Sequence, residues 1–147
     1  MQLMKRKVTP TELALFSRSP VIGSWWEQLN KVDPRRAPKP KADLLDQLLF
    51  ESGHKHEEIL IKDLESKGKK VKKLSGLMTD DAFQETLDVI HEGQYDYIHQ
   101  ASLQNDEIRG SADLLERIYK PSKLGDWSYI PIECKLSSHS KPIYLVQ

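Results

Sequence analysis

Apolar and polar side chains alternate along residues 127–136, which is typical of a strand with one buried face. Successive side chains of a strand point to opposite faces of the sheet. The residues that share the apolar face are Ile130, Ile132, Cys134 and Leu136. Glu133 and Lys135 share the other face, so the pattern predicts an acid and an amine side by side on the exposed side of a sheet.

Two further segments, residues 95–103 and 107–118, also have strand-like patterns, and short polar turns separate the three strands. The sequence therefore predicts a three-stranded antiparallel meander. Asp113 lies on its middle strand, where it could join Glu133 and Lys135; two carboxylates and a lysine suit a divalent cation with a positioned water. Pro131 cannot donate to a ladder, which predicts a bulge or an unpaired position beside Glu133.

Helical spacing of apolar residues precedes the meander. Two apolar stripes predict a helix over residues 42–66, which Gly68 ends. The first stripe is Leu44, Leu45, Leu48 and Leu49, and the second is Ile59, Leu60 and Leu64. Another helix is expected from Thr79 or Asp80 to Gly93. The predicted fold class is α/β of the α+β kind: a helix, the meander, and a last helix from Pro142.

The N-terminal part has a separate helical pattern. Thr9 and Glu12 form a capping box around Pro10, which predicts a short helix, and Ser19-Pro20 begins a second one. Residues 34–40 (PRRAPKP) are too rich in proline for a helix and read as a connector. We therefore divide the chain into an N-terminal helical segment with its connector, 1–40, and a domain over 41–147.

Composition narrows the class of protein. The chain has 147 residues, and 22 basic residues balance 22 acidic ones, so any nucleic-acid site must be a local patch. Its single cysteine, Cys134, excludes an internal disulfide and an all-cysteine cluster formed by one chain. No apolar run approaches transmembrane length, and the N-terminus lacks the apolar core of a signal peptide. We expect a cytoplasmic protein with no membrane partner.

Four motifs together resemble the RecB-like branch of the PD-(D/E)XK nucleases, which have a restriction-endonuclease-like core. In chain order they are Gly53-x-x-His56-Glu57, Gly110-x-Ala112-Asp113, Glu133-x-Lys135, and the end of the chain from Lys141-Pro142 to Gln147. The order of the elements on which they fall also matches that family. The resemblance covers residues 44–147.

The resemblance implies a role for each matching residue. His56, Asp113 and Glu133 would bind Mg²⁺ or Mn²⁺, with the main-chain carbonyl of Cys134 as a further ligand. Lys135 would hold or deprotonate the attacking water. Gln147 corresponds to the glutamine that places the substrate strand in the family. We interpret Glu57 as the next solvent-facing residue rather than as a partner of the metal site.

The chain departs from the family in two respects. Relatives with an iron–sulfur cluster carry four cysteines, so we expect no such cluster here. The family core continues past the position of Gln147, so the domain looks truncated at its C-terminal end. We therefore expect a homo-oligomer or another partner to cover the uncovered side of the sheet.

Two functions of different class follow. The first is a Mg²⁺- or Mn²⁺-dependent nuclease that hydrolyses phosphodiester bonds of DNA, exonuclease-like on single strands. The second is a nucleic-acid-binding or scaffold domain that keeps the fold and does not cleave. The simplest alternative is that Glu133 and Lys135 form an ion pair on the surface of the sheet.

Overall fold

A computed structural model describes residues 7–21, 25, 32 and 43–134. It is a mixed structure of helices and one four-stranded sheet, as the sequence predicts at the level of class. The helices are α1 (Pro10–Arg18), α3 (Leu44–Ser66) and α4 (Asp80–Glu92). The strands are β1 (Val71–Lys73), β2 (Tyr97–Gln104), β3 (Arg109–Ile118) and β4 (Ser128–Ile132).

The sheet has the strand order β1-β2-β3-β4. Strands β2, β3 and β4 form the predicted antiparallel meander. In addition to this meander, β1 forms a fourth strand that pairs with β2 in parallel, so the sheet is mixed. Parallel strands need a crossover connection, and α4 supplies it between β1 and β2.

Local signals begin and end the helices where the sequence predicts. Asp43 and Asp46 form a reciprocal capping box at the start of α3. The Thr79 hydroxyl accepts the Ala82 N–H, 3.2 Å away, at the start of α4. Gly93 ends α4 with a φ of 61°, the left-handed conformation that glycine adopts without strain.

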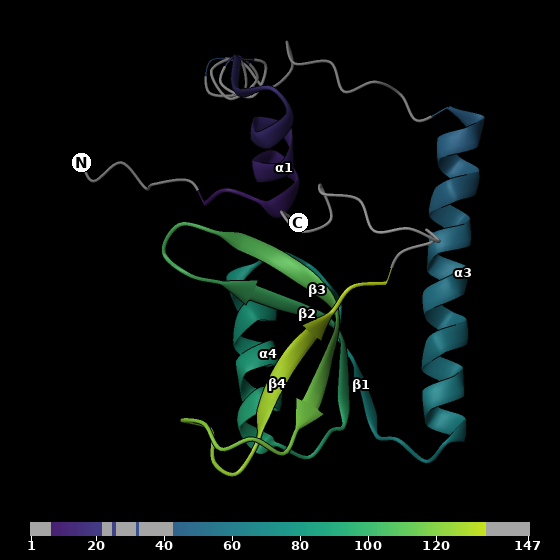
Figure 1. Cartoon of the computed structure of the whole chain (residues 1–147), viewed down its shortest axis with the longest axis vertical. Helices are drawn as coiled ribbons and strands as arrows, with labels where there is room; N and C mark the ends of the chain where they lie inside the picture. Colours follow the sequence, from purple (N-terminus) through teal and green to yellow (C-terminus); the bar gives the residue numbers. More distant parts are fainter. Residues whose placement is uncertain (1–6, 22–24, 26–31, 33–42, 135–147) are drawn as a thin grey trace.

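The core lies between α4 and the sheet (Figure 1). Val89 of α4 packs there with Ile98 and Ala101 of β2 and Leu115 of β3. Leu114, the neighbour of Leu115 in β3, is also buried. Neighbouring side chains of a strand point to opposite faces, so both faces of β3 are covered at this point.

Helix α3 covers the other side of β2 through its middle part, where Glu57 contacts β2 and Ile61 is buried. Its N-terminal half stands clear of the sheet (Figure 1). The first predicted apolar stripe is accordingly exposed, with Leu45 at 64% and Leu48 at 52%. None of the described helices is long and apolar enough to cross a membrane.

Within the described strands, the irregular backbone conformation does not lie at Pro131. Pro131 pairs with Leu115 in the ladder of the edge strand β4, where a missing N–H is tolerated. The irregularity is in β2 at Gln100, whose φ is 57°. The ladder between β2 and β3 omits the rung between Gln100 and Asp113 and keeps its register on either side. The expected bulge is not found at Pro131, whereas the expected unpaired position beside Glu133 is found, because the ladder stops at Ile132.

Candidate functional site

The two predicted carboxylates come from neighbouring strands. Leu114 of β3 pairs with Ile132 of β4, and one further step in this register sets Asp113 opposite Glu133. Residues opposite each other in an antiparallel pair extend to the same side of the sheet. β4 ends at Ile132, however, so Glu133 follows the strand rather than lying within it as predicted.

Beyond the end of β4, a side-chain hydrogen bond takes the place of the main-chain pairing between β3 and β4. The main-chain N–H of Cys134 donates to Oδ2 of Asp113, 2.8 Å away. This bond fixes the half-buried Asp113 carboxylate against the chain that carries Glu133, whose own side chain is exposed. Oxygen donors of this kind are the ligands that Mg²⁺ and Mn²⁺ prefer.

Helix α3 presents Glu57, and not His56, to the sheet. The Glu57 side chain is 17% exposed, and its Oε2 lies 3.2 Å from Nε2 of His99 and 3.0 Å from Nε2 of Gln100. His56 is exposed. Each step of one residue turns the side-chain direction by about 100° around the helix axis, so His56 and Glu57 do not both face β2. The interpretation of Glu57 as a solvent-facing residue is wrong.

The polar cluster formed by Glu57, His99, Gln100 and Ser111 joins α3 to the middle of the sheet. Ser111 Oγ lies 3.4 Å from Oε1 of Gln100, which links β3 to the contact with Glu57. Sequence reasoning missed His99 and Gln100 as contact residues. No local pattern marks them, because the left-handed backbone of Gln100 and the rotation of α3 are both set by tertiary packing.

The predicted site residues are only partly brought together. Asp113 and Glu133 lie on adjacent chain segments, while His56 lies on the exposed side of α3. Within 43–134 and the other described positions, no group of three or more His, Cys, Asp or Glu side chains is placed to hold a metal ion. The ligand role of the Cys134 carbonyl stays a prediction. Lys135 and Gln147 lie outside the described residues.

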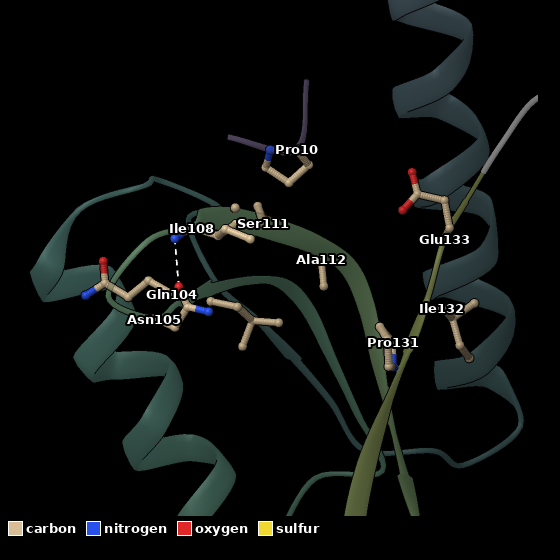
Figure 2. A pocket seen from close by; sticks show the side chains of 11 residues that line it. Pro10, Gln104, Asn105, Ile108, Ser111, Ala112, Pro131, Ile132 and Glu133 are labelled. Carbon is tan, nitrogen blue, oxygen red and sulfur yellow. Dashed lines mark hydrogen bonds between the residues drawn. The ribbon is translucent and has the colours of Figure 1, made fainter. Parts of the chain in front are cut away.

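A groove of about 460 Å³ opens beside the two carboxylates (Figure 2). Its walls come from the first turn of α1, the start of β3 with the turn before it, and the end of β4. The lining residues are Pro10, Leu103, Gln104, Asn105, Ile108, Gly110, Ser111, Ala112, Pro131, Ile132 and Glu133. Glu133 lines the groove, and most of the remaining surface is apolar.

Two tyrosines on the sheet have raised pKa values. The hydroxyl of Tyr97 donates to Oε1 of Glu116, 2.8 Å away, and this bond together with burial raises the pKa of Tyr97. Burial raises the pKa of Tyr129, whose hydroxyl donates to the Tyr95 carbonyl. Both hydroxyls are therefore neutral hydrogen-bond donors that hold the sheet, rather than acid–base groups for chemistry near pH 7.

Comparison of the chain with family models, with curated proteins and with solved structures gives no match. The nuclease interpretation consequently depends on the sequence motifs and on the placement of Asp113 and Glu133.

Proposed function

We propose that the chain is a Mg²⁺- or Mn²⁺-dependent nuclease domain of the PD-(D/E)XK type that hydrolyses phosphodiester bonds of DNA. The observation that carries the proposal is the register between β3 and β4, which sets Asp113 opposite Glu133. The bond from the Cys134 N–H to Asp113 supports it, because this bond holds one carboxylate against the segment that bears the other.

The fold is included in the proposal. Helix α3 contacts β1 and, through Glu57, β2, and the two acids lie where the pairing of β3 with β4 ends. We take this arrangement for a restriction-endonuclease-like core, with β1 and α4 as an addition between α3 and β2.

The roles of the residues follow from their chemistry. A divalent cation would polarise the scissile phosphate and lower the pKa of a bound water. Asp113 and Glu133 would supply oxygen ligands to this cation. Lys135, two residues after Glu133, would hold the attacking water or accept its proton. His56 would need a rotation of α3 to reach the two acids, because its side chain is exposed.

A digestion assay tests the proposal. The chain is incubated with Mn²⁺ or Mg²⁺ and with end-labelled single- or double-stranded DNA and RNA. We expect metal-dependent cleavage of DNA that EDTA abolishes, with single strands preferred. Cleavage of none of these substrates at high protein concentration would overturn the proposal. Equal cleavage with EDTA would show that the activity does not come from a metal site.

The position of His56 favours a second candidate function. Because α3 turns Glu57 and not His56 toward the sheet, the chain is also suited to be a nucleic-acid-binding or scaffold domain without cleavage. Fluorescence anisotropy with a labelled oligonucleotide in EDTA separates the two. Binding without cleavage in Mn²⁺ favours the binding domain, and cleavage favours the nuclease.

A further inference from the structure

The edge of β3 that faces away from β2 pairs with Val8 near its start and with β4 near its end. Between these two paired stretches lies an interval of β3 that belongs to neither of them. At the start of β3 the N–H of Val8 donates to the Glu107 carbonyl, 2.8 Å away, and the Val8 carbonyl accepts the Arg109 N–H at 3.0 Å. At its other end β3 pairs with β4 from Leu114 onward. Residues 110–113 lie between these two paired stretches.

The main chain of Ser111 points out of this interval. In an antiparallel pair, alternate residues turn their N–H and C=O toward the same neighbour. Since Arg109 turns its N–H outward to Val8, Ser111 does the same. The opposite residue agrees, because the Ser102 N–H donates to Oγ1 of Thr86 rather than across to Ser111. Among the described residues, none pairs with the outward main chain of Ser111.

The sequence itself keeps the interval open. Pairing beyond Val8 would next require an N–H from residue 10, and Pro10 has none, so α1 begins there instead. At the other end the ladder stops at Ile132, and the Cys134 N–H is taken up by the Asp113 carboxylate. Pro10 at one end and the Cys134–Asp113 bond at the other therefore stop strand pairing along this edge of β3.

This interval forms the floor of the groove described above, and its shape fits one extended chain. Pro10 stands at one end and Ile132 at the other, with Ser111 and Ala112 between them (Figure 2). Four residues of strand span about 13 Å. One extended segment of about four residues matches the length of this interval.

The lining also favours a peptide over a nucleic-acid strand. The described lining residues include no lysine or arginine, and Glu133 is the charged one among them. The described lining offers no lysine or arginine to pair with a phosphate backbone, whereas main-chain amides can pair with Ser111 and apolar side chains can contact Ala112 and Ile132.

We propose that this groove binds an extended peptide segment of another protein, which adds to the edge of β3 at Ser111. The segment has apolar residues in its middle, which contact Ala112 and Ile132. This proposal does not rest on the proposed nuclease activity, although Glu133 lines the groove and is also a ligand of the proposed cation.

Amide resonances of the full ¹⁵N-labelled chain provide the test. The probe is a capped hexapeptide of alternating valine and threonine with a lysine at each end. Its control is the same peptide with alternate main-chain amides methylated, which removes the donors for strand pairing. We expect the unmethylated peptide to shift the Ser111 amide resonance and to slow its hydrogen exchange at least about tenfold. The methylated peptide should do neither.

Two substitutions at Ser111 give a matched pair. Ser111→Pro removes the outward N–H on an edge where proline is tolerated, and should weaken peptide binding at least about tenfold. Ser111→Ala keeps the main chain and should bind as the wild type does. If Ser111→Pro does not fold, the methylated and unmethylated peptides decide the question with the wild-type chain.

Several results would overturn the proposal. Equal binding of both peptides would mean an apolar contact without strand pairing, and no binding of either would mean that the edge takes no peptide. A Ser111 amide already protected in the free chain would mean that the chain itself, or at higher concentration a second copy, fills the groove. A shift at Ser111 with single-stranded oligothymidine and none with peptide would assign the groove to nucleic acid.

Discussion

Asp113 offers a substitution that separates structure from chemistry. Its Oδ2 accepts the Cys134 N–H at 2.8 Å, and the proposed function also requires its negative charge. Asp113→Asn keeps a carbonyl oxygen where that acceptor stands and removes the charge. Asp113→Ala removes both. The two variants therefore differ in the hydrogen bond and agree in the loss of a metal ligand.

The hydrogen bond sets the size of the effect on stability. A bond to a charged acceptor contributes about 1.5–3 kcal/mol, and the half-buried position favours the lower end, so Asp113→Ala should cost about 1.5 kcal/mol. Asp113→Asn exchanges a charged acceptor for a neutral one and should cost about 0.5 kcal/mol. For a chain of this size these values lower the melting temperature by about 6 °C and about 2 °C, respectively.

Activity should respond differently from stability. Both variants should lose cleavage in Mn²⁺ by about a hundredfold or more, because each removes the negatively charged carboxylate that would bind the proposed cation. Urea unfolding gives the stability, calorimetric titration with Mn²⁺ gives the metal affinity, and the digestion assay gives the rate. Asp113→Asn with wild-type cleavage would refute the metal role. Asp113→Ala as stable as the wild type would refute the contribution assigned to the hydrogen bond.

Three further predictions address other parts of the chain. Lys135→Ala should lose cleavage about a hundredfold while Mn²⁺ titration stays unchanged, because lysine would act on the water and not on the cation. Gly93→Ala should lower the unfolding free energy by about 2–3 kcal/mol in urea unfolding, since φ is 61° there and the added Cβ would lie 2.6 Å from the Trp127 ring. The raised pKa of Tyr97 stabilises the fold below about pH 10. Stability should therefore fall as the pH rises above that value, and Tyr97→Phe should remove part of the fall when urea unfolding is repeated from pH 8 to pH 11.

Local chemistry made the elements predictable. Capping residues and a closing glycine fix where a helix begins and ends, so α4 could be located from Thr79 and Gly93 alone. Alternation located β3 and β4, but it did not identify the face of β4 that packs inward. Ile130 of the predicted apolar face is exposed, and Tyr129 of the opposite face packs against the core. The end of β4 was not predictable, since residues 133–136 continue the same alternation. What stops the strand is the non-local bond from Cys134 to Asp113.

The candidate site was harder to predict because it depends on the orientation of α3. Periodicity shows that a helix has apolar stripes, but it does not say which stripe packs on the sheet. Here Ile61 is buried while Leu45 and Leu48 are exposed, and this rotation turns Glu57 toward β2. The histidine of a sequence motif can thus be one position away from the residue that makes the contact.

Two irregularities of the sheet coincide at Asp113. The rung that would join it to Gln100 is missing, and the pairing with β4 stops at the next residue, Leu114. The left-handed residue Gln100 lies on β2 opposite Asp113. The Asp113 carboxylate joins β3 to the segment after β4 through the Cys134 N–H. A fixed carboxylate on the segment next to Glu133 and an open strand edge at Ser111 therefore occur where the regular pairing of β3 is interrupted on both of its sides.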